Sequence, residues 1–188
     1  MRAGLARTMT VAAAVAVAAV ATVSVACSDG SGTTGGGDTG GDAGGDAGGD
    51  AIEPTGSVRV NEVVNKAPDN QADWVELYNT ADTETALAGW FIRDQNDGHR
   101  FDFPGTAKIP AKGFLVIYGK GGPTDLVMDF AFKSGDAARL FDADGKLADQ
   151  TDWNDGDAPE GTSWGRYPDG TGAFVKLVPT LGSANSAP

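Results

Sequence analysis

The sequence predicts an all-β fold, an antiparallel β-sandwich or barrel, over residues 57–188. Short segments rich in β-branched and aromatic residues recur along this region, and many of them alternate apolar with polar side chains. Aspartate–glycine pairs separate several of these segments and supply the positive φ of tight hairpins. The region lacks a convincing helical pattern for crossover connections, so a parallel sheet is disfavoured.

Alternation defines the individual strands. In the second segment, Val75 and Leu77 point to one face, whereas Trp74, Glu76 and Tyr78 point to the other. The tryptophans, four in number, are expected mostly in the core, although an exposed pair would indicate a face that binds carbohydrate or protein. The predicted strands are 58–64, 74–78, 87–93, 100–103, 114–118, 126–132, 138–141, 147–153, 163–167 and 174–177.

The N-terminal residues 1–26 have the pattern of a signal peptide. Arg2 and Arg7 form a short basic start, and an alanine- and valine-rich run follows over 11–25. This run is short and weakly hydrophobic for a membrane span and suits the apolar region of a secretory signal. The segment is therefore expected to be cleaved before Cys27.

Cys27 is the only cysteine of the chain and follows the small residue Ala26. This position resembles the lipobox of bacterial lipoproteins, in which such a cysteine is acylated, although Ser24 stands where leucine is usual. The alternative is an ordinary signal-peptidase site without a lipid, because Ser24 and Ala26 also fit its small-residue rule. A free thiol at an exported N-terminus would be reactive, which favours lipid attachment at Cys27.

Residues 27–56 are predicted to be a disordered linker after the lipid-attachment cysteine. Glycine, aspartate and alanine dominate this segment, including three Gly-Asp-Ala repeats over 41–51. It holds almost no apolar surface to offset chain entropy, so it should not fold. The domains expected are therefore a signal peptide at 1–26, a tether at 27–56 and a β-domain at 57–188.

The chain is strongly acidic. Its formal net charge is −12, and loss of the two arginines of residues 1–26 takes the processed chain to −14. Such a surface repels phosphate backbones, so direct nucleic-acid binding through a basic patch is not expected. With one cysteine, the chain can form no internal disulfide, so its core or a metal must hold the fold.

An ordered set of motifs resembles the lamin tail domain. The resemblance implies an immunoglobulin-like β-sandwich, and its bacterial members are typically secreted or surface proteins, sometimes joined to hydrolases. Leu181 departs from the pattern, because the family usually has proline before this glycine. The matching residues are 60–63 (VNEV), 73–79 (DWVELYN), 87–90 (LAGW), 101–104 (FDFP), 113–117 (GFLVI), 135–136 (GD), 161–170 (GTSWGRYPDG) and 180–185 (TLGSAN).

Three carboxylates, Glu62, Asp73 and Glu76, lie on segments expected to pair early in the fold. Most acidic residues of such a domain are solvated surface groups. A sharper hypothesis pairs Arg166, which lies between glycine and a turn, with Glu62 or Glu76 as a structural ion pair. The planar guanidinium could reach under a neighbouring strand to a carboxylate.

No metal site is predicted, and calcium is a weak alternative. Oxygen-rich loops occur at 94–98, 142–145 and 154–157, but none fits the twelve-residue calcium loop, and aspartate with glycine is the commonest turn signature. No catalytic residues are assigned. His99 is the only histidine, no nucleophile motif accompanies it, and the glycines at 119–122 lack the full phosphate-loop pattern.

These observations predict a membrane-tethered, non-catalytic binding or scaffolding module of the bacterial cell envelope, an outer-membrane or surface lipoprotein. Its partners would be the membrane, through the lipid at Cys27, and an envelope protein or glycan. No cofactor is expected. The alternatives are a secreted soluble protein, and a small secreted or envelope hydrolase that uses carboxylates, with or without calcium.

Overall fold

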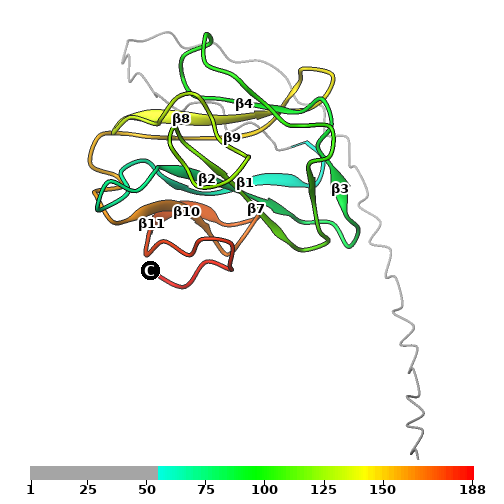
Figure 1. Cartoon of the computed structure of the whole chain (residues 1–188). Coiled ribbons are helices and arrows are strands. Elements are labelled where there is room, and N and C mark those ends of the chain that lie inside the picture. Colours follow the sequence, from blue (N-terminus) through cyan, green and yellow to red (C-terminus); the bar gives the residue numbers. More distant parts are fainter. Residues whose placement is uncertain (1–54) are drawn as a thin grey trace, which may run out of the picture. The chain divides into compact units, whose positions relative to one another are not determined.

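The computed structural model describes residues 55–188, and residues 1–54, with the predicted signal, Cys27 and most of the linker, lie outside this range. The described chain forms two packed β-layers (Figure 1). The strands are β1 (Val58–Val64), β2 (Trp74–Asn79), β3 (Thr85–Ala86), β4 (Phe91–Arg93), β5 (Phe101–Asp102), β6 (Lys108–Ile109), β7 (Phe114–Tyr118), β8 (Asp136–Phe141), β9 (Leu147–Trp153), β10 (Ser163–Tyr167) and β11 (Ala173–Leu177).

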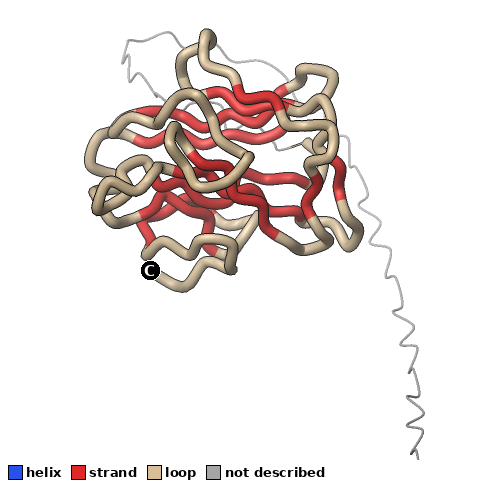
Figure 2. Tube along the Cα trace, viewed as in Figure 1, coloured by secondary structure: helices blue, strands red, loops and turns tan. Residues whose placement is uncertain are grey.

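One layer is a five-stranded sheet in the order β11-β10-β1-β2-β7, and the other is a four-stranded sheet in the order β5-β4-β8-β9. The short strands β3 and β6 form a separate pair. All pairings between named strands are antiparallel. Figure 2 shows only strands and loops in the described part, which confirms the predicted all-β, immunoglobulin-like sandwich. Within residues 55–188 no helix is long and apolar enough to cross a membrane.

The core lies between the two sheets. Strand alternation sends Val75 and Leu77 of β2 into it, and Ala138 and Leu140 of β8 enter it from the other layer. Burial of such side chains contributes about 25 cal/mol for each Å² of apolar surface removed from water. Trp153 is buried, whereas Trp90 and Trp164 are partly buried against the core. The prediction that several tryptophans are core residues therefore holds for Trp153 in the cluster between the sheets, whereas Trp74 is buried outside that cluster.

A bulge in β1 breaks the alternation where the polar residues lie. The register with β2 shifts between Val60 and Glu62, so Val60 pairs with Leu77 whereas Glu62 pairs with Glu76. The extra residue is Asn61, and a bulge of this kind lets Asn61 and Glu62 both face away from the core. Val60 and Val63, on either side, remain core residues.

The prediction of a strand at 126–132 is wrong, and the two very short strands β3 and β6 are not among the predicted strands. The apolar alternation at 126–132 is real, because Met128, Phe130 and Phe132 are all in the core. However, the backbone of this segment bonds Tyr118 and Lys120 at the end of β7, and no continuous ladder forms. The segment crosses from one sheet to the other, so its alternation serves packing without strand pairing.

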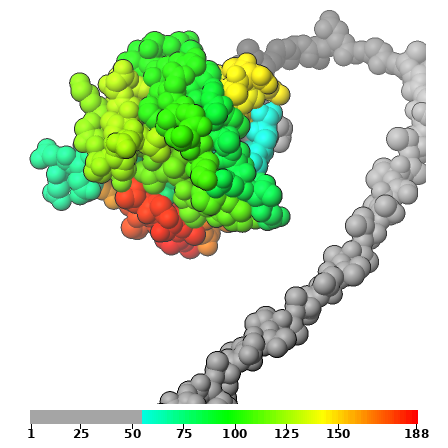
Figure 3. All heavy atoms as spheres, turned by 45° about the vertical axis from the view of Figure 1, so that its right-hand side comes forward, coloured from blue at the N-terminus to red at the C-terminus, as the bar shows by residue number. Residues whose placement is uncertain are grey.

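Residues 178–188, called here the C-terminal strap, follow β11 and run along the outer face of the five-stranded sheet. Figure 1 shows the strap below that sheet, and Figure 3 shows it, in red, along one side of the domain. The strap covers side chains that alternation directs away from the core. Glu62 and Glu76 are 0% exposed as a result.

Candidate functional site

Glu62 sits in the middle of the outer face and binds the strap. Its Oε1 accepts a hydrogen bond from Ser163 Oγ at 2.5 Å, and Oε2 accepts one from Thr180 Oγ1 at 3.0 Å. The backbone N–H of Thr180 lies 3.2 Å from both oxygens. Both carboxyl oxygens are used in these bonds, so Glu62 fixes the start of the strap to β1 and β10.

Glu76 of β2 also binds the strap. Its Oε2 accepts the backbone N–H of Gly182 at 2.7 Å, and its Oε1 accepts Asn61 Nδ2 at 3.1 Å. Gly182 has φ near 70°, the left-handed region in which glycine is favoured. The chain therefore turns its amide toward the carboxylate directly after Leu181.

Asp169 completes the group that we call the outer carboxylate cluster, namely Glu62, Glu76 and Asp169. Asp169 Oδ1 accepts from Asn61 Nδ2 at 2.8 Å and from the backbone N–H of Asn185 at 3.1 Å. Asn61 in turn accepts the Gly170 N–H at 2.9 Å. The cluster thus ties the bulge of β1, the turn after β10 and the strap into one hydrogen-bonded network.

Burial dominates the titration of these acids. It raises the pKa of Glu76 to about 8, against hydrogen bonds from Asn61 and Gly182 that favour the charged form, and the negative charges of Glu62 and Asp169 add to the rise. Burial likewise raises the pKa of Glu62, which Ser163 and Thr180 oppose. Asp73, the third predicted carboxylate, lies apart and accepts the Ala67 N–H at 3.1 Å.

The ion pair predicted between Arg166 and Glu62 or Glu76 is corrected, because Arg166 pairs with Asp149 of β9. Arg166 Nη2 lies 2.9 Å from Asp149 Oδ1 and 3.2 Å from Oδ2, and Asp149 is 2% exposed. Arg166 Nε donates to the carbonyl of Val60 at 3.0 Å, so it does reach under β1 as expected. Its guanidinium carbon lies 4.5 Å from the centre of the Phe174 ring.

Strand alternation explains the different partner. Glu62 pairs with Gly165, and a Cβ built on that glycine would lie 3.2 Å from Glu62 Cγ, so Gly165 faces the outer cluster. The next residue, Arg166, must point to the opposite, inner face. There it meets the second sheet and Asp149. Burial raises the pKa of Asp149, whereas Arg166 and the N–H groups of Val60 and Gln150 oppose that rise.

The oxygen-rich loops serve as turns. Asp142 Oδ1 accepts the N–H of Asp144 at 3.0 Å and that of Lys146 at 2.8 Å, and Asp157 Oδ2 accepts the N–H of Asn154 at 2.8 Å. Within residues 55–188 no group of three or more His, Cys, Asp or Glu side chains is placed to hold a metal ion. These carboxylates act as local backbone acceptors.

His99 lies in a loop before β5 and contacts Asp94, with Nδ1 and Oδ2 2.7 Å apart. Its ring stacks on Phe130 at a centroid distance of 5.1 Å. Among the described residues no serine or threonine hydroxyl bonds to this histidine, so the pair lacks the nucleophile that a hydrolytic triad needs.

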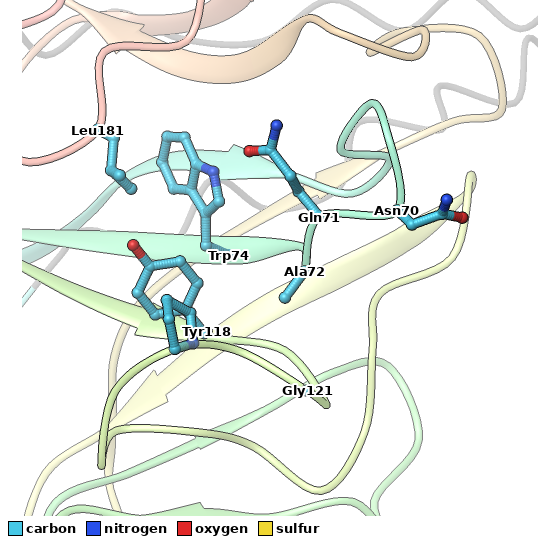
Figure 4. A pocket seen from close by; sticks show the side chains of 8 residues that line it. Asn70, Gln71, Ala72, Trp74, Tyr118, Gly121 and Leu181 are labelled. Carbon is cyan, nitrogen blue, oxygen red and sulfur yellow. The ribbon is translucent and has the colours of Figure 1, made fainter.

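A cleft of about 290 Å³ opens beside the strap. Trp74 of β2 and Tyr118 of β7 are directly paired in the sheet and form its aromatic part (Figure 4). Asn70 and Gln71 of the β1–β2 loop border it, and Leu181 of the strap lies across the Trp74 ring from Gln71 (Figure 4). The remaining lining residues are Ala72, Gly121 and Pro123.

The glycine-rich segment at 119–122 forms a turn, and Gly121 lines this cleft. Gly122 N–H bonds the Gly119 carbonyl at 3.1 Å. A Cβ on Gly122 would lie 2.1 Å from Tyr118 Cβ, so only glycine allows this approach. Strand alternation in the sequence placed Trp74 on the face opposite Val75 and Leu77, but it missed the cleft, because the loop and the strap that complete it are distant in the chain.

Such a helix-free sandwich, with a small cleft on its outer face, is the architecture of an immunoglobulin-like binding or scaffolding module. The model of the lamin tail domain family matches residues 51–155, more than half of the chain, and the chain belongs to this family. The family resemblance is thereby confirmed, and the match includes the motifs between 60 and 136. A search of curated proteins finds no match.

The buried ion pair gives a stability prediction. Asp149→Asn should lower the free energy of unfolding by about 3–5 kcal/mol, because it leaves the Arg166 guanidinium buried without its counter-charge. Denaturant unfolding measures this change. The matched control is Glu160→Gln, which breaks the exposed Lys66–Glu160 pair and should cost less than about 1 kcal/mol. Equal effects of the two substitutions would contradict the assignment.

The raised pKa of Glu76 gives a pH prediction. The folded protein binds a proton at Glu76 that the unfolded chain releases above the ordinary glutamate pKa of 4.5. The stabilisation is therefore full below about pH 4.5 and is lost as pH rises toward 8. The free energy of unfolding should fall between pH 5 and 8 by up to about 1.4 kcal/mol per unit for this group.

Glu76→Gln, which resembles the protonated acid, should flatten that slope in denaturant titrations at several pH values. The raised pKa values of Glu62, Asp73 and Asp149 act in the same direction, so some slope remains in the variant. Wild-type stability that rises from pH 5 to 8, or an unchanged slope in the variant, would show that burial of Glu76 does not control the titration.

Proposed function

We propose that this protein is a membrane-tethered, non-catalytic binding module of the bacterial cell envelope. A lipid on Cys27 would anchor it, residues 28–56 would hold the domain away from the membrane, and the sandwich would recognise an envelope protein or glycan. Membership of the lamin tail domain family supports the binding or scaffolding role. The strongly acidic composition supports partners other than nucleic acid.

The observation that carries this proposal is the use of the buried carboxylates. Glu62 and Glu76 are fully buried, and their oxygens accept hydrogen bonds from Ser163, Asn61 and the strap. A carboxylate hydrolase needs two acids that converge on a bound substrate with room for water. These acids instead hold the strap, whereas the cleft that is open to a ligand has only uncharged lining side chains.

The alternative, a small hydrolase assisted by calcium, would need an acid in that cleft or a cation site. In the loops at 142–145 and 154–157, side-chain oxygens accept hydrogen bonds from nearby backbone N–H groups. This use of the oxygens favours the binding module over the hydrolase. The proposed location is an outer-membrane or surface lipoprotein, and a secreted soluble form is the outcome if Cys27 carries no lipid.

Anchoring at Cys27 is tested by expressing the full chain in a bacterial host. The mature wild-type protein should partition into detergent and have an intact mass above that of residues 27–188. Cys27→Ser should remain in the aqueous phase, because each buried methylene of an acyl chain adds about 0.8 kcal/mol of membrane binding.

The matched control is Ser28→Ala, which alters the neighbouring small residue and leaves the thiol intact. This variant should keep the added mass and the detergent partitioning of the wild type. Wild-type and Cys27→Ser masses that differ only by the sulfur-to-oxygen exchange would refute lipid attachment and leave the secreted soluble form.

A further inference from the structure

The cleft beside the strap has polar groups that the protein itself does not use. Among the hydrogen bonds of residues 55–188, none involves Trp74 Nε1, Tyr118 Oη or the side-chain amides of Asn70 and Gln71. By contrast, the indole N–H of Trp153 and that of Trp164 each bond a protein oxygen at 3.1 Å. Buried tryptophan normally finds such a partner.

Trp74 is the most telling of these residues because it is only 6% exposed. The polar side-chain atoms of the described residues that are both wholly buried and unbonded are Asn65 Oδ1 and Arg93 Nε. Trp74 Nε1 is therefore unbonded but still accessible, and it lies in the cleft. This donor has no partner within the protein, so it is free to bond a ligand oxygen.

The chemistry of the lining limits what the ligand can be. Tyr118, Pro123 and Leu181 supply apolar surface, whereas Trp74, at 6% exposed, adds little. Two amides, a phenol and an indole N–H offer both donors and acceptors. No lining side chain is charged, although residues 55–188 carry twenty acidic and twelve basic side chains. This combination suits a neutral molecule that has an apolar C–H face and hydroxyls at its rim, and the volume lies at the small end of ligand sites.

We propose that this cleft binds one or two neutral sugar rings of a glycan. The apolar face of a pyranose packs on the partly exposed Tyr118 ring, and its hydroxyls bond Trp74 Nε1, Tyr118 Oη and the amides of Asn70 and Gln71. Leu181 forms the opposite wall, and Gly182 next to it is held by Glu76 at 2.7 Å. This assignment rests on the proposed function as a binding module and names its ligand class.

The experiment is a titration of the full chain carrying Cys27→Ser, followed by the indole N–H signals in ¹H–¹⁵N spectra. Trp74→Phe identifies the Trp74 signal by its loss, and the Trp153 and Trp164 signals serve as internal references. The probes are maltotriose, cellotriose and chitotriose, with trigalacturonate, choline and a proline-rich peptide as charged and peptide comparisons. At least one neutral trisaccharide should shift the Trp74 signal saturably and leave the references in place.

Gln71→Ala and Tyr118→Phe should each weaken that binding about three- to tenfold, the effect of one lost hydrogen bond. Gln71 is exposed, so its substitution should not disturb folding. The matched control, Gln150→Ala, removes an amide on the other sheet and should leave the affinity unchanged. Equal affinities in Gln71→Ala and in the control would overturn the proposed contacts.

Other outcomes separate this assignment from the proposed function. A Trp74 signal that does not respond to any neutral trisaccharide, or responds as well to trigalacturonate, choline or the peptide, would overturn the glycan site and leave the tethered module standing. New anomeric signals during the titration would show hydrolysis of the bound sugar. That result would contradict the non-catalytic role but support the sugar site.

Discussion

The structure depends on how the outer face of the five-stranded sheet is covered. Glu62 and Glu76 sit at its centre, where a carboxylate without partners would be costly to bury. The strap supplies the backbone N–H groups of Thr180 and Gly182 to these acids, and Ser163 and Asn61 complete their bonds. The acids thus fix an irregular C-terminal segment, which also bonds the sheet through Asn185 Nδ2 and the Arg166 carbonyl.

Two further features follow from this arrangement. Because Gly182 is held by Glu76, Leu181 is placed against Trp74 and completes one wall of the cleft. On the inner face, Arg166 and Asp149 join the two sheets, and strand alternation keeps this pair apart from the outer acids. The bulge at Asn61 lets one short strand serve both faces, with Val60 in the core and Glu62 in the cluster.

The sequence was sufficient for the fold class and for most strands, because alternation and aspartate–glycine turns are local signals. It also placed Arg166 under a neighbouring strand, but its partner depends on which face the residue takes. The bulge at Asn61 and the pairing of Gly165 with Glu62 decide that face, and both arise only on sheet assembly. The segment 126–132 alternates like a strand yet crosses between layers, and the cleft joins residues about 110 positions apart in the chain, Gln71 and Leu181.

The central claim is that the outer carboxylates hold the strap in the folded protein. Amide hydrogen exchange at single-residue resolution tests it most directly, because the Gly182 and Thr180 amides are the groups that bind Glu76 and Glu62. Both amides should exchange far more slowly than those at the end of the strap, such as Ala187, and Glu76→Ala should release Gly182. Exchange of Gly182 and Thr180 as fast as in an unstructured peptide would contradict the account.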